Sequence, residues 1–455
     1  MPLAATLAAL ALAGLVVARG ATRAEPAVPP TVVATSPAYP LRVSASERYL
    51  VDSNDTPFLM VGDSPQALIG VLNDQDIESF LANRQRYGFN TVWVNLLCND
   101  YTGCKADGTT FDGTPPFVTP GDLGTPNEAY FARVDRALAL AGKYGMNVLL
   151  DPIETGGWLK VLRANGTAKA YQYGVYVGTR YKDVPNIIWM SGNDFQSWSD
   201  PTDDALVVAV AQGIRAADPV HLQSVELNYY VSSSLDDPTW QPLIQLEAAY
   251  TYQPTYAEVL KDYARENFKP VVMVEANYEQ EHDYTGPATL RRQEYWAVLS
   301  GAAGQLFGNK YTWQFAQDWK SHLDTSGSLQ LAYATNLFSS RSWYDLVPDQ
   351  QHSFVTQGFG TFASTGSVNN SDYVTAAVTS DHKLGMAYVP SARTLTVDMT
   401  QLAGPVNARW YDPTNGTYAT ISDAPLDNVG PRDFTTPGKN SAGDGDWVLV
   451  LELSS

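Results

Sequence analysis

The chain has 455 residues, of which 44% are hydrophobic and 17% are charged, with 34 glycines and 28 prolines. This is a globular composition with enough apolar mass for a core, and it excludes a disordered or collagen-like chain. Lys and Arg number 29 against 48 Asp and Glu, a formal net charge of -19. Such a field repels phosphate backbones and anionic membranes, so we expect no nucleic acid as a partner. The length favours a large domain followed by a smaller one.

The N-terminus has the pattern of an export signal. Residues 1–24 form an apolar stretch followed by small residues that suit a cleavage site near Ala24, although no basic side chain precedes Arg19. We expect a signal peptide over residues 1–24 and a secreted or periplasmic mature protein; a mis-chosen start codon or a retained N-terminal anchor is the alternative. Residues 25–40 are rich in Pro, Thr and Ala, which predicts a flexible leader. No later stretch approaches the ~20 apolar residues of a membrane span.

The two cysteines of the chain, Cys98 and Cys104, bracket the short loop CNDYTGC. In an exported protein, two cysteines this close most often form a disulfide, whereas a free pair is the alternative in the cytoplasm. Because so short a loop has little closure entropy to lose, we expect the bridge to shape this loop more than to stabilise the whole fold.

From residue 41 onward, short apolar runs alternate with helical segments, which indicates βαβ units and a parallel sheet. The first run, residues 58–62, ends at Asp63 and is followed by a helical period over residues 74–87. Eight such runs predict an α/β fold, a closed (β/α)8 TIM barrel over residues 41–346. The further expected strands are 91–97, 147–150, 186–190, 221–227, 244–250, 271–274 and 305–307, and the further helices are 127–144, 168–181, 203–217, 256–267, 289–299 and 329–338.

The pattern changes after Trp343. Between residues 354 and 453, β-type runs such as 373–378 and 447–453 are separated by turn clusters such as DPTNG. Several short strands with turn signals between them are typical of a small antiparallel sheet protein. We therefore predict a C-terminal β-sandwich domain over residues 350–455.

Polar residues at the carboxyl ends of barrel strands are the candidates for chemistry, because active sites of parallel barrels lie there. Asp194 follows strand four and Glu275 ends strand seven, so the two carboxylates are expected on opposite sides of the mouth. Glycoside hydrolysis needs such a pair: one carboxyl protonates the leaving oxygen, while the other attacks the anomeric carbon or activates water. Candidate sugar-binding residues near the strand ends are Asp63, Glu154, Trp158, Asn193, Tyr252, Trp313 and Gln314.

Each of these residues also has a purely structural interpretation. Asp194 could cap the helix that follows it, since Asp is a favoured capping residue. Glu275 could be the buried ion-pair partner of Lys310 or Arg291, and Asp63 could hold a loop in place rather than contact sugar. Tyr252 has two alternatives of its own: it could orient the nucleophile by a hydrogen bond, or pack as an ordinary barrel aromatic.

Several motifs resemble known glycoside hydrolases. WMSGND (189–194) and VMVEANYE (272–279) are similar to the retaining (β/α)8 clan, in which an acid/base follows strand four after an Asn and a nucleophile ends strand seven. A closer resemblance is to the apiosidase-like glycoside hydrolase family, whose members often carry a C-terminal sandwich named as a collagen-binding domain. That resemblance is carried by RYLVDSNDTPFLMVGDSP (48–65), SFLANRQRYGFNTVWVNLL (79–97) and YWAVLSGAAGQLFGNKYTWQF (295–315).

The resemblance implies Asp194 as the acid/base, Glu275 as the nucleophile and Asp63 as a sugar-binding carboxylate. The chain departs from the family pattern at Asn193, where Gly is usual, and at Gln305, where His is common. An Asn before the acid can donate a hydrogen bond to a sugar hydroxyl beside the anomeric centre, which fits a retaining mechanism.

We therefore predict an exported glycoside hydrolase that acts on a plant or bacterial polysaccharide, with a furanoside such as apiose or arabinofuranose as its sugar. Asp194, which must act as acid and then as base, is expected to have a raised pKa. No metal-ligand cluster, phosphate loop or dinucleotide fingerprint stands out in the sequence, so we expect no cofactor. The alternative is an inactive barrel that binds a carbohydrate or matrix glycan together with the sandwich.

Overall fold

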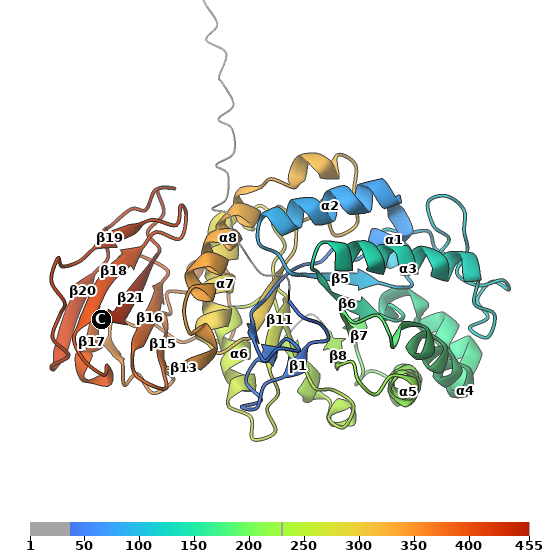
Figure 1. The fold of residues 1–455 in the computed structure, drawn as a ribbon, viewed down its shortest axis with the longest axis horizontal. Helices are drawn as coiled ribbons and strands as arrows, with labels where there is room; N and C mark the ends of the chain where they lie inside the picture. Colours follow the sequence, from blue (N-terminus) through green and yellow to red (C-terminus); the bar gives the residue numbers. More distant parts are fainter. Residues whose placement is uncertain (1–36, 229–230, 455) are drawn as a thin grey trace, which may run out of the picture.

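The computed structural model describes residues 37–228 and 231–454. The signal peptide predicted over residues 1–24 lies outside the described residues, as does the leader up to residue 36, so both stay predictions. A (β/α)8 barrel and an antiparallel sandwich lie side by side (Figure 1), as the sequence predicts. Within the described residues, no helix has both the length and the apolar character needed to cross a bilayer.

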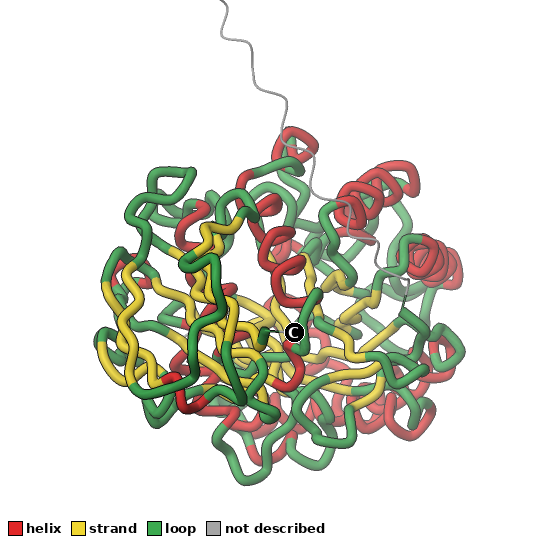
Figure 2. Tube along the Cα trace, turned by 60° about the vertical axis from the view of Figure 1, so that its left-hand side comes forward, coloured by secondary structure: helices red, strands yellow, loops and turns green. Residues whose placement is uncertain are grey.

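Eight parallel strands form the barrel, and helices surround them on the outside (Figure 2). In chain order the strands are β4 (Met60–Asp63), β5 (Thr91–Asn95), β6 (Asn147–Asp151), β7 (Ile187–Phe195), β8 (Gln223–Leu227), β10 (Glu247–Thr251), β11 (Val271–Glu275) and β12 (Gly304–Phe307). Each strand pairs with the next one in this order, except that no strand ladder joins β8 to β10, and β12 returns to pair with β4. A short strand, β9 (Val231–Ser233), pairs antiparallel with β10. All eight carboxyl ends therefore meet at one mouth.

Two serine side chains close the barrel between β8 and β10, where no strand ladder joins the sheet. The hydroxyl of Ser224 donates to the carbonyl oxygen of Leu246 at 2.8 Å. The hydroxyl of Ser234 donates to the carbonyl of Val225 at 2.5 Å and accepts the N–H of Ala248 at 2.8 Å. These bonds satisfy backbone groups that a regular ladder would otherwise pair.

The helix after β6 begins earlier than the sequence predicts. It consists of two helical segments that meet at a break at Gly166; the first begins at Thr155, and the second contains the predicted helix over residues 168–181. Gly156 and Gly157 lie in its first turn, and Gly166 inside it has a non-helical φ of 73°, so the hydrophobic period breaks up where the helix begins. The helices are α1 (Leu68–Val71), α2 (Asp74–Arg86), α3 (Glu128–Lys143), α4 (Thr155–Tyr181), α5 (Pro201–Ala217), α6 (Thr255–Tyr263), α7 (Pro287–Leu299) and α8 (Ser326–Ser339).

A small antiparallel sheet at the amino-terminal end of the barrel was not predicted. It consists of β1 (Arg42–Val43), β2 (Leu50–Val51) and β3 (Pro57–Phe58). Two-residue strands carry no readable period, which is why sequence analysis missed them.

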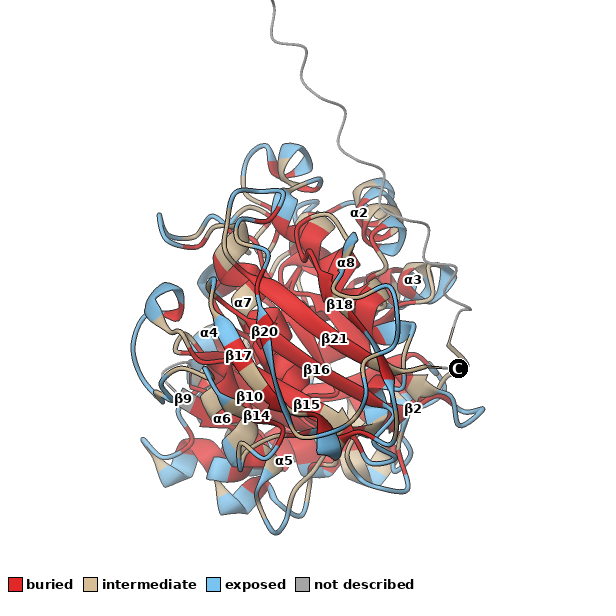
Figure 3. Ribbon diagram, turned by 90° about the vertical axis from the view of Figure 1, so that its left-hand side faces the viewer, coloured by how far each residue is buried: buried red, intermediate tan, exposed pale blue. Residues whose placement is uncertain are grey.

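The C-terminal domain consists of two antiparallel sheets with an apolar core between them, so the predicted sandwich is confirmed (Figure 3). It starts at Leu346, slightly before the predicted boundary at residue 350, because the first strand already pairs into the larger sheet. The larger sheet contains β13 (Leu346–Pro348), β15 (Thr375–Thr379), β16 (Leu384–Val389), β21 (Trp447–Leu453), β18 (Val406–Tyr411) and β19 (Tyr418–Thr420), and the smaller one β14 (Val355–Gln357), β17 (Thr394–Asp398) and β20 (Pro431–Thr435).

The sandwich packs against α7 of the barrel. Arg291 of α7 donates to both carboxylate oxygens of Asp446 at 2.8 Å, with both side chains buried. The ring of Tyr295 stacks on that of Tyr388, with 5.0 Å between ring centroids. Arg291 is thereby fully engaged away from the mouth, so the interpretation of Glu275 as its ion-pair partner is wrong.

Candidate active site

Asp194 lies on a left-handed bulge in β7, whose last residues extend beyond the predicted end of that strand. The φ angles of Gly192, Asn193 and Asp194 are 118°, 77° and 56°, and the pairing of β7 with β8 shifts register at this point. Positive φ is disfavoured for residues with a Cβ, so the two non-glycine residues are strained. A Cβ at Gly192 would overlap the carbonyl oxygen of Glu226, so only glycine fits there.

Three neighbouring elements hold this bulge in place. The hydroxyl of Thr155, in the first turn of α4, donates to the carbonyl oxygens of the two residues before Asp194, at 2.9 and 2.7 Å. Glu226 of β8 accepts the backbone N–H of Asp194 at 2.6 Å. The hydroxyl of Tyr101 donates to Oδ2 of Asp194 at 2.5 Å. Asp194 is therefore fixed by a barrel strand, a helix start and a loop rather than capping a helix.

Glu275 ends β11 without a positive φ, at a point where the pairing with β10 shifts register, and is held by tyrosines. The hydroxyl of Tyr252 donates to Oε1 at 3.1 Å, and that of Tyr278 donates to Oε2 at 2.9 Å. Tyr250 in turn donates to the hydroxyl of Tyr252 at 2.9 Å. Of the two alternatives for Tyr252, the structure thus favours orientation of Glu275. Each carboxylate oxygen has its own donor, which fixes the rotation of the carboxyl group.

The two carboxylates belong to one electrostatic system. Burial and, after it, the negative charge of Asp194 raise the pKa of Glu275 to about 8, although the surrounding tyrosine hydroxyls oppose the rise. Burial also raises the pKa of Asp194, against the hydrogen bonds of Tyr101 and Tyr250. The raised pKa predicted for Asp194 is present, but it is shared with Glu275. Neighbouring carboxyls of this kind hold a proton near neutral pH because both cannot ionise easily.

A third carboxyl, Glu226, lies beneath the pair. It is fully buried, and burial together with the charges of Asp194 and Glu275 raises its pKa well above the usual range. We therefore treat Glu226 as a neutral acid that accepts the N–H of Asp194. Sequence analysis placed it inside strand five and missed it. An acid within the apolar run SVEL was the signal, because an unpaired charge is rarely buried.

An amide side chain joins the two halves of the site. Gln66 donates to the hydroxyl of Tyr278 at 3.4 Å, and its own carbonyl oxygen accepts the amide of Asn193, also at 3.4 Å. Asn193, in the middle of the bulge, is buried, and its side-chain carbonyl oxygen has no hydrogen-bond partner within the described residues. Its proposed contact with a sugar hydroxyl therefore stays a prediction.

Asp63 is not a sugar-binding residue, and that prediction is wrong. Its carboxylate accepts Nε of Arg84 at 2.5 Å and the N–H of Ser64 at 2.7 Å. Both Asp63 and Arg84 have no exposed surface. Because Arg84 belongs to α2 in the outer layer, the pair fastens that helix to the end of β4. Of the two alternatives for Asp63, the structural one is therefore favoured, although the element that Asp63 holds is a helix rather than a loop.

Trp158 and Glu154 were predicted to contact the substrate, and both predictions are wrong because the two side chains are buried in the structure. Trp158 is buried and packs edge-on against Phe117, 6.0 Å between ring centroids. Glu154 has no exposed surface and accepts the N–H of Asn99 at 3.2 Å; burial raises its pKa to about 8. Both residues lie under the long loop after β5, whose course could not be read from the sequence.

Trp313 and Gln314 follow β12 and are half-buried. The ring of Trp313 lies edge-on to Tyr278, 6.4 Å between ring centroids, so it is next to a hydrogen-bond partner of Glu275. Gln314 packs against Gly103: a Cβ on that glycine would lie 2.8 Å from the Cβ of Gln314. Both positions are compatible with the predicted substrate contacts.

Tyr101 is the most exposed residue of the site and was not predicted. It lies in a short 3-10 helix, residues 100–102, inside the loop closed by the disulfide between Cys98 and Cys104, which is present as predicted. Its side chain is 43% exposed although the hydroxyl is bonded to Asp194. No local signal separates this tyrosine from an ordinary loop residue.

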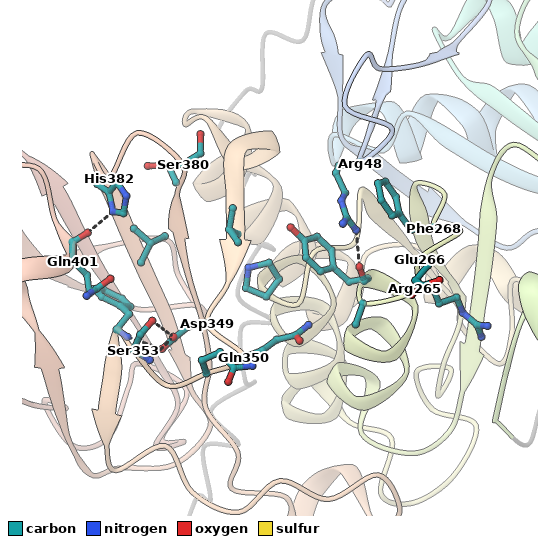
Figure 4. A pocket seen from close by; sticks show the side chains of 18 residues that line it. Arg48, Arg265, Glu266, Phe268, Asp349, Gln350, Ser353, Ser380, His382 and Gln401 are labelled. Atoms are coloured by element: carbon teal, nitrogen blue, oxygen red, sulfur yellow. Dashed lines mark hydrogen bonds between the residues drawn. The ribbon is translucent and has the colours of Figure 1, made fainter.

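A cavity of about 610 Å³ lies away from the mouth, between the sandwich and the loops that precede the barrel strands (Figure 4). Two of its polar residues have partners within the protein. Asp349 accepts the N–H groups of Ser353 and Phe354, and Arg48 donates to the carbonyl of Tyr263 while lying over two aromatic rings. Because neither Asp194 nor Glu275 lines it, this cavity is not the candidate active site.

Fold and site together define the class of this protein: a (β/α)8 glycosidase with two carboxylates at the ends of strands four and seven. The family described as "Apiosidase-like, catalytic domain" matches residues 44–345. The chain belongs to this family. Residues 361–452 match the "Putative collagen-binding domain of a collagenase", so the architecture expected from the resemblance is confirmed.

Solved structures agree on the fold over nearly the whole chain. A structure named "Glycoside hydrolase" is 24% identical with a TM-score of 0.78, covering 92% of this chain and 97% of its own. A glycoside hydrolase family 5 structure from Bacteroides vulgatus ATCC 8482 is 22% identical with a TM-score of 0.79, covering 91% and 93%. No curated protein matches the chain.

Proposed function

We propose that the protein is an exported glycoside hydrolase that removes a furanoside, such as apiose or arabinofuranose, from a plant or bacterial polysaccharide by a retaining mechanism. The observation that carries this proposal is the pairing of Asp194 and Glu275 at the mouth. Each has a tyrosine hydroxyl on its carboxylate, and the charge of one raises the pKa of the other.

The two carboxyls have different surroundings, and this assigns their roles. Glu275 accepts two tyrosine hydroxyls, which favour the ionised form that a nucleophile needs. Asp194 is only partly buried on its bulge, where a leaving group can reach it, and is therefore the residue that we expect to keep the shared proton. In this scheme Asp194 protonates the leaving oxygen while Glu275 attacks the anomeric carbon. Asp194 then deprotonates the water that releases the sugar.

Family membership supports a furanoside as the sugar, since the family is named for an activity on apiose. Trp313 beside Tyr278 offers an apolar face close to Glu275, as sugar rings require. Export is supported by the disulfide between Cys98 and Cys104, because disulfides persist in oxidising compartments.

The proposal is tested by incubating the purified protein with apiose-containing pectin, arabinan and galactofuranose-containing bacterial polysaccharides. Released sugars are identified by chromatography, and the anomer formed first is read by NMR. We expect one sugar class, released with the anomeric configuration of the substrate. First release of the opposite anomer would overturn the retaining mechanism while leaving the hydrolase intact.

Three variants provide the controls. Asp194→Ala and Glu275→Ala should both abolish release, whereas Glu294→Gln should keep it, because Glu294 is a buried acid of α7 whose charged neighbours are Arg291 and Glu279. Binding of one glycan by all these proteins with no release by any of them would instead support the inactive carbohydrate-binding alternative.

A further inference from the structure

The loop between Cys98 and Cys104 is built so that Tyr101 reaches Asp194. The disulfide joins the two ends of the loop, with 5.9 Å between their Cα atoms. Inside it, the side chain of Asn99 accepts the N–H of Tyr101 at 2.9 Å, and its carbonyl accepts the N–H of Cys104 at 2.8 Å. The bridge and these bonds fix the direction in which Tyr101 leaves the backbone.

The loop rests directly on the start of α4. A Cβ at Gly156 would overlap the ring of Tyr101, and one at Gly157 would overlap the side chain of Asn99. The loop can therefore pack closely on the helix only because these two successive residues are glycines. Glycine is otherwise unfavourable in a helix. Just before these glycines in the chain, Glu154 accepts the N–H of Asn99 at 3.2 Å. These contacts fix the position of the loop on the barrel.

The first turn of α4 also holds the bulge that carries Asp194. Thr155, next to Gly156, bonds the bulge that carries Asp194. The first turn of α4 thus positions both Tyr101 and Asp194. The hydroxyl of Tyr101 donates to Oδ2 of Asp194 at 2.5 Å. On the opposite side of the loop, Gln314 packs against Gly103.

We propose that the Cys98–Cys104 loop is part of the active site, with Tyr101 as a positioning residue for Asp194, and that reduction of the disulfide weakens catalysis through this one contact. The proposal rests on the proposed function of Asp194 as acid/base. Reduction opens the S–S bond to two thiols, taking two electrons and two protons from an added thiol or phosphine reductant. The loop ends are then joined only through hydrogen bonds.

Removal of the Tyr101 hydroxyl has a defined sign. A donor to a carboxylate favours its ionised form, so the pKa of Asp194 rises when the donor is lost. Asp194 must be protonated to act as the acid, so the alkaline limb of the pH–rate profile moves to higher pH. The other titratable groups that face Asp194 are Glu154 of α4, Glu226 of β8, Tyr250 and Tyr252 of β10 and its following loop, Glu275 of β11 and Glu281 after it.

The first test compares Tyr101→Phe with the full-length wild type, using the polysaccharide that the wild type hydrolyses. We expect kcat to fall about 10-fold and the alkaline limb to move up by about one pH unit. Tyr344→Phe, which removes a hydroxyl from a tyrosine 38% exposed beyond α8, is the matched control and should change neither. An alkaline limb that stays in place in Tyr101→Phe overturns the proposal.

The second test asks whether the disulfide acts through Tyr101. Treatment with tris(carboxyethyl)phosphine, or the double change Cys98→Ser and Cys104→Ser, should give the loss seen in Tyr101→Phe. Neither should reduce the activity of Tyr101→Phe any further, because contacts on one path are not additive. A thermal melt identifies any variant that fails to fold. A full additional loss in the Tyr101→Phe background contradicts the coupling.

A measurement without substrate separates this inference from the proposed function. The Asp194 carboxyl is coupled to glycine ethyl ester with a water-soluble carbodiimide, which reacts with protonated carboxyls, and labelling is read by mass spectrometry against pH. The labelling midpoint should move to higher pH in Tyr101→Phe and in the reduced wild type. An unchanged midpoint refutes the role of the loop; a shifted midpoint in a protein that releases no sugar refutes the proposed function instead.

Discussion

The two carboxylates at the mouth are held by different kinds of structure. Glu275 ends β11 without a positive φ, although β11 shifts register against β10 there, and its donors Tyr252 and Tyr278 lie within three residues of a strand end. Asp194 lies on a strained bulge whose contacts come from elements far apart in the chain, among them Tyr101 and Glu226. The nucleophile position is thus local, whereas the acid position depends on tertiary assembly.

This difference matches the demands of the proposed chemistry. A nucleophile attacks one atom along one line, so a carboxylate fixed at both oxygens is suitable. An acid/base must give up a proton and later take one back, so its environment needs to tolerate both charge states. Strained backbone at such a site is common when the surrounding structure holds it in place. We therefore expect substitutions around Asp194 to have wider effects than those around Glu275.

The largest expected effect is from the carboxylates themselves. Glu275→Gln should reduce activity on the order of 10⁴-fold or more, because it removes the nucleophile. Asp194→Asn should cost less, about 10² to 10⁴-fold, with the smaller loss on aryl glycosides whose leaving group needs no proton. Rates on aryl and alkyl glycosides of the released sugar check this. Equal losses of activity on aryl and alkyl glycosides would contradict the assignment of Asp194 as the general acid.

The second prediction tests the bulge. Gly192→Ala places a Cβ on the carbonyl of Glu226, so activity should fall about 10²-fold and the free energy of unfolding by about 2 to 4 kcal/mol. Gly366→Ala is the matched control: its φ of 117° equals that of Gly192 within a degree, but nothing lies within 4 Å. It should cost only about 1 to 2 kcal/mol and leave activity unchanged. Similar activity losses in both variants would show that the bulge is not specially constrained.

The third prediction concerns the buried acid beneath the bulge. If Glu226 is neutral, Glu226→Gln keeps the acceptor for the N–H of Asp194 and should retain activity within about 3-fold of the wild type. Glu226→Ala leaves that N–H without its acceptor and should cost about 10-fold. Steady-state rates near pH 7 decide the matter. A Gln variant as poor as the Ala variant would mean that the carboxylate charge is required.

The smallest expected effect is on the Glu275 side. Tyr278→Phe removes a donor from the Glu275 carboxylate, which raises its pKa. Glu275 must be ionised to attack, so the acidic limb of the pH–rate profile should move up by about half to one pH unit. The alkaline limb should stay in place, in contrast to Tyr101→Phe. Movement of the alkaline limb instead would exchange the roles of the two carboxyls.

The sequence was sufficient for the barrel and for the two carboxylates. Strand periodicity locates the carboxyl ends, and parallel strands bring those ends together whatever the loops do. Asp194 and Glu275 could be found for that reason. Asp63 fulfilled the same criterion but was assigned wrongly, because its partner Arg84 comes from a helix whose burial against β4 is a tertiary fact.

The remaining differences arise from the long loop after β5. Trp158 was expected to contact sugar, yet that loop covers it. Tyr101 was not predicted, because the sequence of a seven-residue disulfide loop does not show where a tyrosine side chain within it points. Glu226 could have been found, since it is an acid near the end of a barrel strand and the same reasoning applies to it.

The most direct test of the central claim is to trap the sugar on the enzyme. Asp194→Ala removes the base of the second step, so an activated aryl glycoside of the released sugar should accumulate as a glycosyl-enzyme. Peptide mass spectrometry after rapid acid quenching should find the mass of one sugar residue on Glu275. A sugar found on another side chain, or product formed with no adduct on Glu275, would contradict the account.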